Sequence, residues 1–123
     1  MNVRVARRGP AGKYEMWRRC RDLQQWPTWM AGVRDVEASG DLRPGLEGAL
    51  VLPGGVRVAF DVLAVDTLGP AWTRVLRLGP LRLEVEHHVD EGFGLVDVSG
   101  PFPLPLLYVP LARRSLSRLL RRG

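Results

Sequence analysis

The side chains best suited to chemistry lie in the alternating segment 81–89, where His87 and His88 are adjacent. Neighbouring residues of a β-strand point to opposite faces of the sheet, so these two imidazoles cannot bind one metal ion together. Glu84, Glu86 and His88 share a face, but such a stripe is far more often solvated than metal-binding. We therefore predict no metal site.

His87 is the stronger candidate, because its place in the alternation matches that of Leu83 and Val85. Its imidazole should therefore face the interior. The simpler interpretation is a core histidine that is hydrogen-bonded to the backbone. The alternative is a group that orients a ligand or transfers protons, for which a half-buried imidazole is chemically suited.

Arg74 alternates in step with Trp72 and Leu76. If these two residues face inward, the guanidinium reaches the interior and could hold a carboxylate or a phenolate. If the alternate set that begins at Ala71 faces inward instead, Arg74 is exposed to solvent. Both orientations fit the sequence.

Other catalytic signals are missing from the sequence. Gly40, Gly45 and Gly48 lie between expected strands and do not open a helix, as a phosphate-binding loop would require. The serines have no nucleophile-elbow context. We therefore predict no cofactor, and any catalysis would fall to His87 or Arg74.

Alternating apolar segments predict seven strands. The first covers residues 2–8 and is followed by helical spacing over residues 11–22. Pro27 prevents this helix from continuing, so residues 23–30 should form a separate short helix or turn. Six further strands, joined mostly by glycine- and proline-rich turns, are expected at residues 33–38, 47–52, 56–67, 71–78, 81–89 and 93–99. Tight turns between consecutive strands indicate an antiparallel sheet with one apolar face.

The C-terminal segment should supply the helix that covers this face. Its apolar residues recur at helical spacing with arginines on the other side, and the leucines of this face are Leu107, Leu111, Leu116, Leu119 and Leu120. Pro110 either lies in the first turn or kinks a longer helix that begins near residue 103. This order of elements excludes a doubly wound parallel fold.

Residues 14–30 resemble the opening of proteins of the START-like, or SRPBCC, superfamily (polyketide cyclase/dehydrase type). In that superfamily the first helix ends in a D-x-x-x-W-P-x-W turn, which corresponds here to residues 22–29. The segments 33–37 and 42–48 and the position of Trp72 are also similar to the pattern of these proteins.

The resemblance implies an α+β helix-grip fold in one domain over residues 1–123. In this fold a curved seven-stranded antiparallel sheet wraps around the C-terminal helix, and two short helices lie between strands 1 and 2. A cavity remains between sheet and helix. Relatives bind lipids, sterols, polyketides or quinones, and some catalyse aromatic cyclisation.

In such a fold the core and the cavity wall share their residues. The expected ligand-binding residues are Trp26, Trp29, Val58, Phe60, Trp72, Leu76, Leu83, Val85, His87, Leu107, Tyr108 and Leu111. The first hypothesis is a carrier or sensor of a lipid, quinone or polyketide-like ligand. The alternatives are a cyclase- or dehydratase-like enzyme that uses His87 or Arg74, and an accessory module that acts through protein contact. Convergent polar groups would favour the enzyme, an apolar cavity the carrier, and a filled interior the contact module.

Charge limits the possible partners. The 123-residue chain has a net charge of +5, but the basic side chains gather in residues 1–21 and 101–123 and the middle is net acidic. We interpret the ends as solvated faces, with a weak contact to an anionic membrane surface as the alternative. The single cysteine, Cys20, allows no intrachain disulfide, and the first residues lack the apolar core of a signal peptide, so we expect a cytoplasmic protein.

We predict that the arginine-rich ends do not bind nucleic acid specifically. No aromatic residue is interleaved with the C-terminal arginines, between residues 113 and 122, to stack on bases. A charged strip beside an apolar helix face should give dissociation constants of about 10⁻⁴–10⁻⁶ M. Titration of single- and double-stranded oligonucleotides at ~150 mM salt measures this. Submicromolar binding that is abolished by replacing Arg113, Arg114 and Arg118 with alanine would contradict the prediction.

Overall fold

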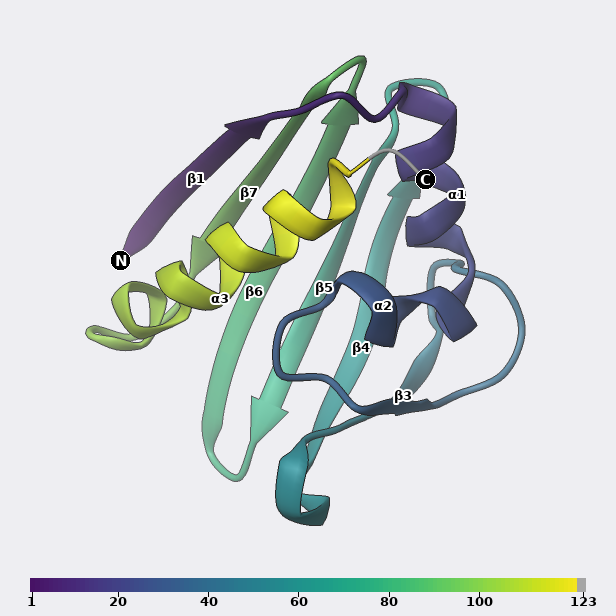
Figure 1. The fold of residues 1–123 in the computed structure, drawn as a ribbon. Coiled ribbons are helices and arrows are strands. Elements are labelled where there is room, and N and C mark those ends of the chain that lie inside the picture. Colours follow the sequence, from purple (N-terminus) through teal and green to yellow (C-terminus); the bar gives the residue numbers. More distant parts are fainter. Residues whose placement is uncertain (122–123) are drawn as a thin grey trace.

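The computed structural model, which describes residues 1–121, contains a curved sheet of seven antiparallel strands in the order β1-β7-β6-β5-β4-β3-β2 (Figure 1). The strands are β1 (Asn2–Arg8), β2 (Asp35–Glu37), β3 (Glu47–Val51), β4 (Arg57–Asp66), β5 (Ala71–Leu78), β6 (Leu81–Asp90) and β7 (Phe93–Ser99). From β2 to β7 each strand pairs with the next one in the chain, and β1 pairs with β7. The predicted sheet is therefore confirmed.

The helices lie on one side of this sheet (Figure 1). They are α1 (Lys13–Arg21), the 3₁₀ turn η1 (Leu23–Gln25), α2 (Trp26–Trp29) and the C-terminal α3 (Leu104–Leu119), and a further 3₁₀ turn, η2 (Pro53–Gly55), joins β3 to β4. The predicted order of strand, two helices, six strands and helix is confirmed. None of the helices within residues 1–121 is long and apolar enough to cross a membrane.

The W-P-x-W turn caps the C-terminal end of α1. The last carbonyls of a helix have no partner within the helix and must find one elsewhere. Trp26 Nε1 donates to the carbonyl of Cys20 at 2.8 Å, and Trp29 Nε1 donates to that of Arg19 at 3.1 Å. The backbone amide of Leu42, in the β2–β3 loop, donates to the carbonyl of Arg21 at 3.2 Å. Cys20 itself is buried, and this burial raises the pKa of its thiol to about 12.

The second half of α3 packs against the sheet through the fully buried Leu116 and Leu119. Gly94 on β7 permits the close approach, because a Cβ atom there would lie 2.9 Å from Leu116 Cδ2. Ser115 Oγ accepts a hydrogen bond from the backbone amide of Ala31 at 2.9 Å, which ties α3 to the segment after α2. The expected covering of the sheet by a C-terminal helix is therefore found.

The prediction that Leu107 faces the sheet is wrong, because this side chain is 66% exposed. Leu107 precedes Leu116 by about two and a half turns at 3.6 residues per turn, so it lies on the opposite side of α3. The small buried residues Pro105 and Ala112 take the inward positions instead. Pro110 lies inside a helix that begins at Leu104, as the second of the two alternatives had it. The C-terminal Arg122 of the basic segment lies outside the described residues.

We predict that Trp26→Ala and Trp29→Ala each lower the free energy of unfolding by about 3–5 kcal/mol. Each change opens a cavity in the core and removes the hydrogen bond to a carbonyl of α1. Urea denaturation measures the loss. Tyr14→Ala is the matched control, since this aromatic residue of α1 is 89% exposed. Losses below about 1 kcal/mol at both tryptophans would show that the turn does not anchor the helix.

Candidate ligand-binding site

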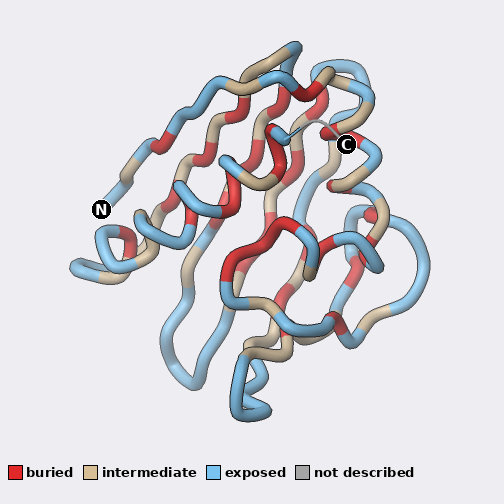
Figure 2. Tube along the Cα trace, viewed as in Figure 1, coloured by how far each residue is buried: buried red, intermediate tan, exposed pale blue. Residues whose placement is uncertain are grey.

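A cavity of about 210 Å³ lies between α3, the segment that follows α2 and the concave face of the sheet. Its wall is almost entirely aliphatic, with Leu76 and Leu83 from the β5–β6 hairpin and Val58 from β4. Tyr108 and Leu111 of α3 form the opposite wall. Figure 2 shows that the strands are buried beneath the helices and become exposed toward the β5–β6 turn, which is the end where the cavity lies.

The residues predicted to bind a ligand fall into three groups. The cavity is lined by Val58, Leu76, Leu83, Tyr108 and Leu111, together with Arg74. The closed core, outside the cavity wall, contains Trp26, Trp29, Phe60, Trp72, Val85 and His87. Leu107 alone is on the outer surface of α3.

The sequence-based prediction missed part of the wall. Leu78 and Leu81 line the cavity on either side of the β5–β6 turn, and Leu50 lines it from β3. The alternation that selected Leu76 and Leu83 continues to Leu78 and Leu81, so extending it to the end of each strand would have found them. Leu50 pairs directly with Val58 in the sheet, which only the register reveals.

Arg74 lies on the concave face and is only 2% exposed. Its Nη2 donates to Tyr108 Oη at 3.3 Å and its Nη1 to the Met30 sulfur at 3.2 Å. The guanidinium carbon lies 5.2 Å from the centre of the Trp72 ring and 5.6 Å from that of Trp26. Within residues 1–121 no carboxylate forms an ion pair with Arg74, and its Nε has no hydrogen-bond partner. Burial lowers the pKa of Arg74 below its ordinary value, although an arginine side chain keeps its charge in proteins.

His87 faces the interior, as predicted, but its imidazole makes no hydrogen bond with a backbone group of the described residues. Both of its ring nitrogens are buried without a partner among the described residues. The imidazole instead stacks on Trp72 at 4.3 Å between ring centres and meets the edge of Trp29 at 6.0 Å. Burial first, and then the nearby charge of Arg74, hold the pKa of His87 well below 6.5. The ring is therefore neutral at physiological pH. His87 is also not among the residues that line the cavity.

The cavity is mostly apolar, as expected for a carrier, but it also contains two convergent polar groups, as expected for an enzyme. No carboxylate, imidazole or thiol belongs to the part of its wall that the structure describes, and Tyr108 is the one side chain there of a kind that commonly transfers protons. The Ser115 hydroxyl already accepts a hydrogen bond from the backbone amide of Ala31. The convergent polar pair is therefore Arg74 with Tyr108, and His87 does not reach a molecule in the cavity.

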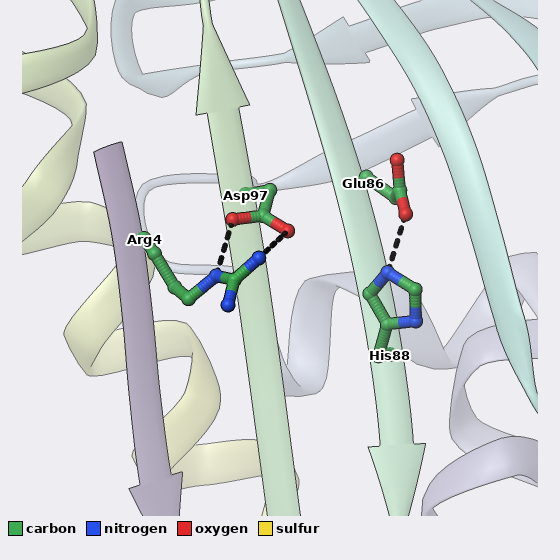
Figure 3. Close-up of polar contacts among 4 residues, drawn as sticks. All are labelled: Arg4, Glu86, His88 and Asp97. Carbon is green, nitrogen blue, oxygen red and sulfur yellow. Dashed lines mark hydrogen bonds and ion pairs between the residues drawn. The ribbon is translucent and has the colours of Figure 1, made fainter. Parts of the chain in front are cut away.

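A second polar cluster lies on the other face of the sheet (Figure 3). Glu86, His88 and Asp97 offer ligand atoms within 4.8 Å of one another. Arg4 already binds Asp97 through two hydrogen bonds of 2.8 and 3.3 Å, and the His88 ring contacts Glu86. A metal ion would have to compete with the Arg4 guanidinium for Asp97, and the absence of a metal site stays a prediction. Asp97 was missed because it joins the group only through the pairing of β7 with β6.

No family model and no curated protein matches the chain. Solved structures do match it over nearly its full length. XoxI from Bacillus cereus is 15% identical with a TM-score of 0.76, and the match covers 97% of this chain and 92% of that protein. Ara h 8.0201 is 13% identical with a TM-score of 0.69, covering 97% and 94%.

DynU16, a protein of the dynemicin biosynthetic locus, is 20% identical with a TM-score of 0.72. The match covers 98% of this chain but 46% of DynU16, so the chain spans about half the length of that protein. These likenesses and the topology together show that the chain has a helix-grip fold. The fold that the sequence resemblance implied is confirmed.

We predict that His87 makes stability depend on pH. Its pKa in the folded protein lies below the ordinary 6.5, so the unfolded chain binds the proton more readily. Above pH 6.5 His87 is neutral in both states and makes its full contribution to the free energy of unfolding. As the pH falls from there toward the folded-state pKa, the free energy of unfolding should decrease by up to about 1.4 kcal/mol per pH unit.

Denaturant titrations between about pH 7.5 and pH 5.5 measure this decrease around the ordinary histidine pKa. His87→Phe keeps a ring beside Trp72 but cannot be protonated, and its stability should fall less over this range. His88→Gln on the opposite face is the control and should keep most of the decrease, because His88 is the smallest of the three causes that lower the pKa of His87. Equal decreases for His87→Phe and the unmodified protein would contradict the prediction.

Proposed function

We propose that this protein binds a small hydrophobic molecule in the cavity beneath α3, as a carrier or a sensor. The observation that supports this most directly is the aliphatic cavity itself. The side chains of β4, β5, β6 and α3 surround a space of about 210 Å³ that opens to solvent near the exposed Leu78 and Leu81. A ligand that fills this space would remove aliphatic surface from water.

The size of the cavity favours a small ligand. Pockets that enclose drug-sized molecules usually measure about 300–1,000 Å³, and this one is smaller. Among the ligand classes that the resemblance implies, a short acyl chain or a compact aromatic or polyketide-like molecule fits better than a sterol or a complete membrane lipid. DynU16 belongs to a biosynthetic locus, which agrees with a biosynthetic small molecule, although this chain shares only the fold with it.

The alternatives have less support. An enzyme of the cyclase or dehydratase kind would have to rely on Arg74 and Tyr108, because His87 lies outside the cavity. A module that acts only through protein contact would need no cavity. The weak contact with an anionic membrane surface and the cytoplasmic location stay predictions.

We predict that the unmodified protein binds the neutral fluorescent probe N-phenyl-1-naphthylamine and that Leu83→Trp weakens this binding at least tenfold. The larger ring should fill the cavity that Leu83 lines. Fluorescence titration measures the affinity, and native mass spectrometry of the freshly purified protein identifies any molecule that it retains.

Leu107→Trp is the matched control, because it adds the same side chain to the exposed side of α3. Overpacking a core can cost about 1–3 kcal/mol, so thermal denaturation must show that both variants are folded. If the unmodified protein does not bind the probe, or if both variants bind it equally, the cavity is not a ligand site.

A further inference from the structure

Arg74 carries a charge for which the described part of the chain supplies no counter-charge. It lies in the middle of the sheet, opposite Val62 on β4 and Val85 on β6, and is almost fully buried. A buried ion is strongly unfavourable unless it is paired and hydrogen-bonded. The nearby aromatic rings of Trp26 and Trp72 stabilise a cation, but they do not neutralise it.

The hydrogen-bonding capacity of Arg74 is also incompletely used. A guanidinium has five N–H donors, and a thioether sulfur is a weak acceptor. The contacts of Arg74 are the Met30 sulfur and the Tyr108 hydroxyl, while Nε has no partner within residues 1–121. Nη1 and Nη2 carry two N–H donors each and make one of these contacts each, so the guanidinium that lines the cavity keeps unused donors.

The charge and free donors of Arg74 call for an anionic group, and the rest of the cavity wall indicates what kind of molecule can carry that group. Leu76, Leu78, Leu83 and Leu104 form its walls, so a molecule with one charged end can place an apolar body against them. A phosphate monoester carries roughly −1.5 to −2 charges at pH 7, more than one guanidinium neutralises. The other arginine of the wall, Arg82, is exposed at the rim. A carboxylate has a single charge and two oxygens that match the fork of an arginine.

We propose that the ligand carries a carboxylate and that Arg74 binds this group inside the cavity, an inference that rests on the cavity being a ligand site. Tyr108 approaches Arg74 from α3, with its hydroxyl 3.3 Å from Nη2. The same hydroxyl can donate to a carboxylate oxygen. The anion is then held between a residue of the sheet and a residue of the helix, with the apolar body directed toward the β5–β6 turn.

The test compares three ligands with the same chain: octanoate, 1-octanol and methyl octanoate. Displacement of N-phenyl-1-naphthylamine gives the affinities at neutral pH, where octanoate is ionised. The unmodified protein should bind octanoate at least tenfold more tightly than the alcohol or the ester. This comparison needs no variant and therefore does not depend on whether a variant folds.

Arg74→Met should abolish the preference for octanoate while retaining binding of 1-octanol, because an apolar side chain of similar length leaves the wall closed. Tyr108→Phe should reduce the preference by a smaller factor. Arg77→Met is the control, since Arg77 belongs to the same strand but pairs with Asp61 on the other face. It should keep the full preference.

The two proposals fail in different ways. If the neutral probe and 1-octanol bind but octanoate binds no more tightly, the carboxylate inference is wrong and the cavity remains a site for neutral ligands. The inference also falls if Arg74→Met folds and keeps the preference for octanoate. If the probe does not bind to the unmodified protein, there is no displacement to measure and the proposed function itself is wrong.

Discussion

The concave face of the sheet is wider than the helices that the chain supplies to cover it. α1 and α2 close the part that contains Phe60 and Trp72, and the second half of α3 closes the part over β1 and β7 (Figure 1). Between these two blocks, toward the β5–β6 turn, aliphatic side chains line a space that no helix fills. The cavity is therefore a consequence of where the helices begin and end, and the same packing that closes the core at one end leaves it open at the other.

Arg74 lies at the boundary between the closed core and the cavity. On one side are the rings of Trp26 and Trp72, which also form the centre of the hydrophobic core. On the other side is the unfilled space. The aromatic cluster thus has two roles, since it stabilises the fold by burying apolar surface and fixes the guanidinium by stacking against it. A substitution of a core residue that does not line the cavity should therefore still change the position of the guanidinium at the cavity wall.

Alternation and turn residues suffice to predict every strand, because a sheet with one buried face repeats every two residues. They indicate which face a residue takes but not whether a helix covers it, so the tryptophans of the closed core and the leucines of the cavity carry the same signal. The burial of helix residues depends on the angle around the axis, which separates Leu107 from Leu116. Two orientations of Arg74 fitted the sequence equally well, and its burial decides between them. The grouping of Asp97 with Glu86 depends on strand register, which no local pattern specified.

Cys20 in the last turn of α1 has no exposed surface, and its raised pKa keeps the sulfur in the thiol form. Alkylating reagents react with the thiolate and must reach it. Modification therefore requires that α1 separate from the core around Trp72, and its rate measures how often this part of the native protein opens. The sequence contains a single cysteine, so the signal has one source and needs no engineered label. The same measurement with the cavity occupied would report whether a molecule bound beneath α3 tightens the opposite end of the helix layer.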